Sequence, residues 1–140
     1  MVGKYKVITL CGSTRFKDAF LEAQKRLTLA GNIVISVGLF GHAGDQEVWE
    51  GMPEDTVTRT KAMLDDMHLR KIDLSDAIYV LNVGGYIGES TRSEIFYAAV
   101  TEKEILYLEP DKPLQVDFLS SEEGDSREDV IQRLEEYGIR

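Results

Sequence analysis

Short apolar runs alternate along this chain with segments whose apolar residues recur at helical spacing. The strand-like runs cover residues 5–10, 32–37, 77–83 and 104–108. The helix-like segments cover residues 16–30, 56–72 and 91–101. This alternation is typical of βαβ units, whose right-handed crossovers build a parallel sheet with helices on both faces.

The pattern weakens after Pro110, where residues 114–119 fit an edge strand and residues 127–137 fit a charged helix. We therefore expect one α/β domain over residues 1–140. It is predicted to be a flavodoxin-like three-layer sandwich, with a parallel sheet of four to five strands in the order 2-1-3-4-5. In that order the first and third strands are neighbours, and ligands bind at their carboxyl ends.

The charge balance limits the possible partners. A net charge of −9 disfavours polymeric nucleic acid, because phosphate neutralisation needs a basic face, although a few focused cations still bind a small anion. Cys11 is the only cysteine, so no intramolecular disulfide forms. No run approaches the ~18 apolar residues of a membrane helix. We expect a cytoplasmic protein with a small-molecule ligand and no membrane partner.

The tripeptide Ser-Thr-Arg occurs twice, at residues 13–15 and 90–92, each time after a strand-like run and at the start of a helix-like one. If the strand order is right, both copies lie at one crevice, where helix N-termini and two arginines favour a bound anion such as phosphate. The alternative is helix capping, since Ser and Thr are good N-cap residues. The candidate binding residues are Gly12, Ser13, Thr14, Arg15, Ser90, Thr91 and Arg92.

Glu94 also has two interpretations. Thr91 and Glu94 fit a capping box, in which the glutamate accepts a hydrogen bond from the Thr91 backbone N–H. Alternatively, the carboxylate faces the crevice beside the glycine-rich turn at residues 84–88. A carboxylate in that position can attack a sugar carbon and form a covalent glycosyl-enzyme intermediate.

At these residues the chain resembles the nucleoside 2-deoxyribosyltransferase-like family, which includes N-glycosidases of deoxynucleoside 5′-monophosphates. The resemblance covers roughly residues 5–108 and rests on CGSTR, SDAIYVLN, the glycine-rich turn and SEIFYAA. It implies a flavodoxin-like fold, a homodimer or larger homo-oligomer, and a reaction without cofactor or metal. It also implies that Glu94 is the nucleophile, that Gly12, Ser13 and Arg15 hold a 5′-phosphate, and that Asp76 matches a family aspartate.

The chain departs from the family pattern at three places. His68 stands where the family usually has an aspartate that assists at the base or sugar, and Gly88 stands where it has Asp or Ser. Residues 38–55 match no family segment, so the substrate stays open. His68 shares a helical face with Leu64 and Ile72, which leaves a core histidine and a proton-transfer or ligand-contact role as alternatives.

Other neighbouring residues carry weaker predictions. The three acidic residues near His68, which are Asp65, Asp66 and Asp73, are expected on other helix faces. His42 is expected to be exposed or to contact the ligand. Aromatic side chains able to stack on a base, or equally to cap the core, are Phe40, Trp49 and Tyr86. No cluster has a convincing metal-ligand spacing in the sequence.

Together these features predict an enzyme that cleaves the N-glycosidic bond of a (2′-deoxy)nucleoside or its 5′-monophosphate. Water or a second base is the acceptor, and hydrolysis is preferred because the candidate residues suit a phosphorylated substrate. The predicted catalytic residues are Glu94, Asp76 and His68. The alternatives are a non-catalytic nucleotide sensor or sponge on the same fold, and an interaction module that binds no nucleotide.

Overall fold

A computed structural model describes residues 1–41 and 43–112. Its elements are β1 (Val7–Cys11), α1 (Lys17–Leu29), β2 (Ile33–Ile35), the 3₁₀ turn η1 (Gln46–Val48), α2 (Glu54–Asp73), β3 (Ala77–Val80), the 3₁₀ turn η2 (Val83–Gly85), α3 (Glu89–Val100) and β4 (Glu104–Tyr107). The predicted edge strand at 114–119, the predicted helix at 127–137 and His42 lie outside the described residues.

The four strands form a parallel sheet in the order β2-β1-β3-β4, which is a flavodoxin-like topology. The predicted order is confirmed for these strands. β1 and β3 are neighbours, with Ile8 opposite Ala77 and Cys11 opposite Val80. Their pairing continues past the strand ends, because the Leu81 N–H donates to the Cys11 carbonyl at 2.8 Å. The switch point therefore lies where the Cys11 and Leu81 backbones meet.

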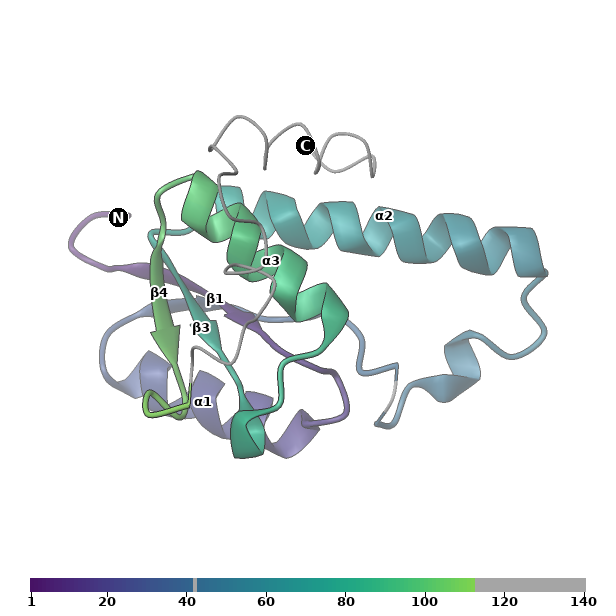
Figure 1. Ribbon diagram of the computed structural model, residues 1–140, viewed down its shortest axis with the longest axis horizontal. Helices are drawn as coiled ribbons and strands as arrows, with labels where there is room; N and C mark the ends of the chain where they lie inside the picture. The colour runs from purple at the N-terminus through teal and green to yellow at the C-terminus, as the bar shows by residue number, and fades with distance from the viewer. Residues whose placement is uncertain (42, 113–140) are drawn as a thin grey trace.

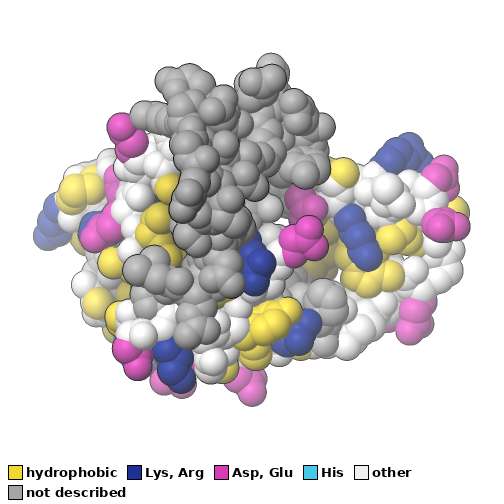
Figure 2. Space-filling model, in the orientation of Figure 1, with side chains coloured by type: hydrophobic (Ala, Val, Ile, Leu, Met, Phe, Trp, Pro, Cys, Tyr) yellow, Lys and Arg dark blue, Asp and Glu magenta, His cyan; other side chains and the backbone are white. Residues whose placement is uncertain are grey.

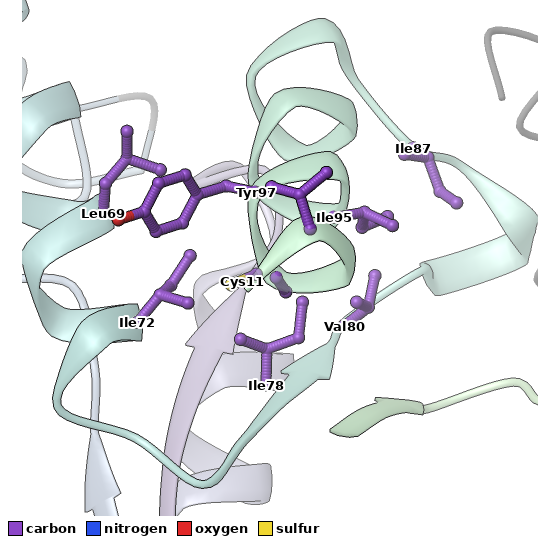
Figure 3. Packing of buried hydrophobic residues seen from close by; sticks show 10 residues of the cluster. Cys11, Leu69, Ile72, Ile78, Val80, Ile87, Ile95 and Tyr97 are labelled. Atoms are coloured by element: carbon purple, nitrogen blue, oxygen red, sulfur yellow. The ribbon is translucent and has the colours of Figure 1, made fainter. Parts of the chain in front are cut away.

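Helices cover both faces of this sheet (Figure 1). Successive residues of a strand point to opposite faces, so Ala77 and Tyr79 of β3 pack with the α1 residue Phe20 on one side. Ile78 and Val80 pack on the other side, against α2 and α3. Figure 3 shows that second cluster, with side chains from the sheet and both helices pointing toward one another. Burial on both faces explains why the strands are continuous apolar runs.

Only the second half of α2 packs on the sheet. Its buried residues are His68, Leu69 and Ile72, whereas Met63 is 52% exposed. The first half extends beyond the sheet, and the chain between β2 and α2 runs beneath it (Figure 1). Within the described residues no helix is long and apolar enough to cross a membrane.

Candidate functional site

A cavity of about 680 Å³ lies at the carboxyl ends of β1 and β3. It is enclosed by the segment after β1, the segment after β2 together with Trp49, one face of α2 and the start of α3. This is the crevice that the strand order predicts. The predicted site residues that line it are Gly12, Ser13, Thr14, Arg15, His68, Gly88, Ser90, Thr91 and Glu94.

The first Ser-Thr-Arg copy is a loop that precedes α1. The N-cap of α1 is Phe16, and no side chain caps the helix, so the capping interpretation is wrong for this copy. Ser13 Oγ instead accepts hydrogen bonds from Arg15, from Nε at 3.0 Å and from the backbone N–H at 3.3 Å. The Arg15 guanidinium lies over the Tyr86 ring, 4.8 Å from its centroid. These contacts hold an exposed cation at the cavity.

Gly12 allows this loop to pass close to the end of β3. A Cβ at Gly12 would lie 3.1 Å from Leu81 Cβ and 3.3 Å from the Leu81 carbonyl oxygen. Both neighbours belong to the packed core or backbone, so neither yields easily. A glycine at this position therefore brings the two strand ends together at the cavity floor.

The second copy lies inside a helix. α3 begins at Glu89 with Gly88 as N-cap and no capping side chain, so the predicted capping box between Thr91 and Glu94 is wrong. Thr91 is buried within the first turn, and Ser90 is exposed at the cavity. Arg92 is exposed but is not among the residues that line the cavity, so the fold does not bring the second arginine to the first.

Glu94 meets His68 and Cys11 at the inner end of the cavity. His68 Nε2 lies 3.7 Å from Glu94 Oε1 and 3.5 Å from Cys11 Sγ. Only 9% of the His68 side chain and 16% of the Glu94 side chain are exposed, and Cys11 is fully buried. The three groups come from α2, α3 and β1, and they form one buried polar contact next to the apolar core.

Burial sets the protonation of this cluster. It raises the pKa of Glu94 to about 8, and a hydrogen bond with Cys11 opposes that shift. It lowers the pKa of His68 to about 4, with the positive charge of Lys71 adding to the effect. Burial also raises the pKa of the Cys11 thiol well above its ordinary value. At neutral pH the histidine is neutral and the glutamate is mostly protonated.

Four charged residues that line the cavity were not predicted, and they are Lys61, Asp65, Lys71 and Glu89. Asp65 was expected on another face of its helix, but it lines the cavity, and its negative charge raises the pKa of Glu94. Lys71 lines it too, donates to the Ser36 carbonyl at 2.9 Å and lowers the pKa of Glu94. Asp65 and Lys71 both stand three residues from His68, on the same helical face, and that spacing is the signal that could have identified them.

Asp76 lies at the other end of the sheet. It precedes β3, where its carboxylate accepts hydrogen bonds from the N-terminal ammonium of Met1 at 2.6 Å and from the Val7 N–H at 2.7 Å. These bonds and the positive charge of the ammonium lower the pKa of Asp76. The cavity lies at the carboxyl ends of the strands, so Asp76 does not line it.

The surface near the cavity carries both signs of charge. On the face that Figure 2 shows, Lys and Arg side chains are scattered singly among Asp and Glu side chains. Among the cavity residues the cations are Arg15, Lys61 and Lys71. This distribution suits recognition of a compact ligand by a few groups.

The fold and site define a class, a flavodoxin-like α/β protein with a ligand-sized cavity at the switch point of its sheet. Comparisons with family models, with curated proteins and with solved structures gave no match.

Proposed function

We propose that this protein cleaves the N-glycosidic bond of a nucleoside 5′-monophosphate, with a 2′-deoxy sugar preferred and water as the acceptor. The observation that carries the proposal is that Arg15 and Glu94, which are 79 positions apart in the sequence, line one cavity. The resemblance to the nucleoside 2-deoxyribosyltransferase-like family assigns a phosphate contact and a nucleophile to these same two residues.

The cavity suits a mononucleotide in size and charge. Its volume of about 680 Å³ is within the ~300–1,000 Å³ of typical small-molecule sites. Arg15 and Ser13 supply a cation and a hydroxyl for the 5′-phosphate. Tyr86 and Trp49 also line the cavity and offer aromatic faces to a base. The Glu94 side chain is more buried than Arg15, and we expect the sugar of a bound mononucleotide to lie next to it.

The reaction is a double displacement at C1′. The Glu94 carboxylate attacks C1′ as the bond from C1′ to the base nitrogen breaks, and the electron pair leaves with the base. The base then takes a proton. Water supplies it, so ionisation of Glu94 alone sets the pH dependence of the reaction. Water next attacks C1′, releases the sugar phosphate and regenerates the carboxylate.

The neighbours of Glu94 suit this role. A buried carboxylate is a stronger nucleophile than a hydrated one, and Lys71 favours its ionised form. His68 stays neutral at physiological pH, so it neither pairs with Glu94 as a cation nor repels the oxocarbenium-like transition state. His68 is therefore a neutral neighbour of Glu94, 3.7 Å from its carboxylate, and the proton for the base comes from water.

The second candidate is a non-catalytic nucleotide sensor on the same site. The specific observation in its favour is the pKa of Glu94, about 8, which leaves most of the carboxyl groups protonated and able to donate a hydrogen bond to a ligand. The resemblance implies that either protein is a homo-oligomer, and that stays a prediction.

Release of free base distinguishes the two candidates. Purified protein is incubated with each deoxynucleoside 5′-monophosphate and each parent deoxynucleoside, and the base is quantified chromatographically. We expect release from at least one monophosphate and loss of that release in Glu94→Gln. Tight nucleotide binding by calorimetry without base release from any substrate would establish the sensor instead.

A further inference from the structure

Three side chains of different chemistry converge at the inner end of the cavity. Cys11 Sγ, His68 Nε2 and a carboxylate oxygen of Glu94 all lie within 4.8 Å of one another. No two of them are close in the sequence, so no local spacing reveals the cluster. A thiolate, an imidazole and a carboxylate are together the usual ligands of Zn²⁺.

The separations fit a tetrahedral metal ion. Zinc bonds of about 2.3 Å to sulfur and 2.0–2.1 Å to nitrogen or oxygen put sulfur and nitrogen about 3.6 Å apart, and nitrogen and oxygen about 3.3 Å apart. The observed separations are 3.5 Å from Cys11 Sγ to His68 Nε2 and 3.7 Å from His68 Nε2 to Glu94 Oε1. The third separation, from Cys11 Sγ to the Glu94 oxygen, is at most 4.8 Å, so a movement of the Glu94 carboxylate toward Cys11 and His68 would complete the geometry.

The orientation of the His68 ring suits metal coordination. Its Nε2 faces the thiol and the carboxylate, and the ring also forms a hydrogen bond with the backbone of Leu10. A backbone carbonyl that holds the second ring nitrogen is the common outer-shell partner of a zinc-bound histidine.

We propose that Cys11, His68 and Glu94 form a Zn²⁺ site with three protein ligands and an open coordination position toward the cavity. Cys11 is fully buried, so the ion enters past His68 and Glu94, whose side chains are partly exposed. Binding displaces the thiol proton of Cys11 and any proton on Glu94, whereas His68 binds in its neutral form. Affinity therefore rises with pH.

A bound ion changes what the cavity does. The oxygen that coordinates zinc is unavailable to attack C1′, so Zn²⁺ inhibits base release. This consequence rests on the proposed function, whereas metal binding itself does not. The open position would hold a water molecule or an anionic ligand.

Cobalt and zinc titrations of the 140-residue chain test the site. Chelator-treated protein is titrated with Co²⁺ and its absorption recorded, and Zn²⁺ binding is measured by calorimetry. We expect one equivalent of metal, a thiolate-to-cobalt charge-transfer band in the near ultraviolet, and binding at least about tenfold weaker in Cys11→Ser and His68→Asn. Glu22→Gln, which alters an exposed carboxylate on α1, is the control and should bind as wild type does.

The outcomes separate the two proposals. No thiolate band in the wild type, or unchanged Zn²⁺ binding in both Cys11→Ser and His68→Asn, overturns the metal site without reference to activity. Circular dichroism and thermal unfolding establish that the variants are folded. A thiolate band with unimpaired base release supports the metal site and counts against Glu94 as the nucleophile.

Discussion

The two Ser-Thr-Arg segments have the same three residues and different places in the fold. The first, residues 13–15, is a loop before α1, and its arginine lies over Tyr86 at the cavity. The second, residues 90–92, lies in the first turn of α3, and its arginine is exposed and does not line the cavity. The position of the helix start, rather than the tripeptide, decides whether the arginine lines the cavity.

The two segments therefore contribute different groups to the cavity. The loop contributes a cation and a hydroxyl, whereas the helix contributes Ser90, Thr91 and, one turn further on, Glu94. In a helix, residues three or four apart share a face, so Thr91 and Glu94 line the cavity together while Arg92 lies to one side. The resulting site is asymmetric, with an exposed arginine at one side of the cavity and a buried carboxyl group at the other.

The largest expected effect on the rate comes from replacing Glu94, because it is the proposed nucleophile. Glu94→Gln keeps the shape and removes the nucleophile, so kcat should fall by at least about 10³-fold, as for other nucleophile replacements. Glu22→Gln, at an exposed carboxylate of α1 outside the cavity, is the control and should cost less than about tenfold. Steady-state assay of base release measures both. Comparable rates for the two variants would contradict the division of roles.

The second-largest effect is expected on KM, and it should differ between the two arginines, Arg15 and Arg92. Losing a charge-assisted hydrogen bond costs ~1.5–3 kcal/mol, so Arg15→Ala should raise KM for a nucleoside 5′-monophosphate by about 10–100-fold. Arg92→Ala should change it by less than about twofold. KM for the parent nucleoside should respond to neither variant. An equal response to both substitutions would mean that the two segments do share the phosphate.

Glu94, in α3, should make the free energy of unfolding depend on pH, whereas the loop at residues 13–15 should not. Its pKa is about 8 in the folded protein and ordinarily 4.5, so its contribution to stability is complete below pH 4.5 and lost as pH rises toward 8. From pH 6.5 to 8, Glu94→Gln should gain up to about 2 kcal/mol in unfolding free energy relative to wild type.

Chemical denaturation at several pH values measures that gain. His68, with its pKa lowered to about 4, changes stability only below its ordinary pKa of 6.5, so it does not contribute in this range. Ser13→Ala, in the loop segment, is the control and should follow the wild-type pH dependence. A constant difference between Glu94→Gln and wild type would rule out a raised pKa.

The same pKa predicts the pH–rate profile. Attack requires the carboxylate, so kcat/KM should rise about tenfold per pH unit below pH 8 and level off above it. Base-release rates between pH 6 and 9.5 measure this. A profile that falls with pH through this range would mean that Glu94 acts in its protonated form.

The smallest effect is expected at the opposite end of the sheet. Asp76→Asn weakens bonds to Met1 and Val7 but touches nothing in the cavity, so kcat/KM should change by less than about twofold. The assay that gives the Glu94 and Arg15 values measures it. A large loss of activity without loss of folded protein would show that Asp76 takes part in catalysis, as the sequence predicted.

Most of the fold followed from the sequence because period-two and period-3.6 apolar patterns are local. Strand and helix positions were correct within a few residues, and the strand order followed from the alternation of elements. The prediction failed at helix starts: α3 begins two residues before Thr91, which removes the capping box and turns Arg92 away.

The site was harder to predict because side-chain direction depends on packing. Short motifs and the strand order predicted that residues 13–15 and Glu94 lie at one crevice, but Asp65 and Lys71 required knowing which face of α2 lines the cavity. The contact between Cys11, His68 and Glu94 joins a strand end and two helices, and nothing in local spacing predicts it.

The stereochemistry of transfer to methanol tests the role of Glu94 most directly. The reaction with a β-deoxynucleoside 5′-monophosphate is run in buffered methanol, and the anomer of the methyl deoxyriboside phosphate is assigned by NMR. A covalent intermediate on Glu94 predicts two inversions at C1′, and therefore the β-methyl product. The α-methyl product would mean direct displacement, with no bond between Glu94 and the sugar.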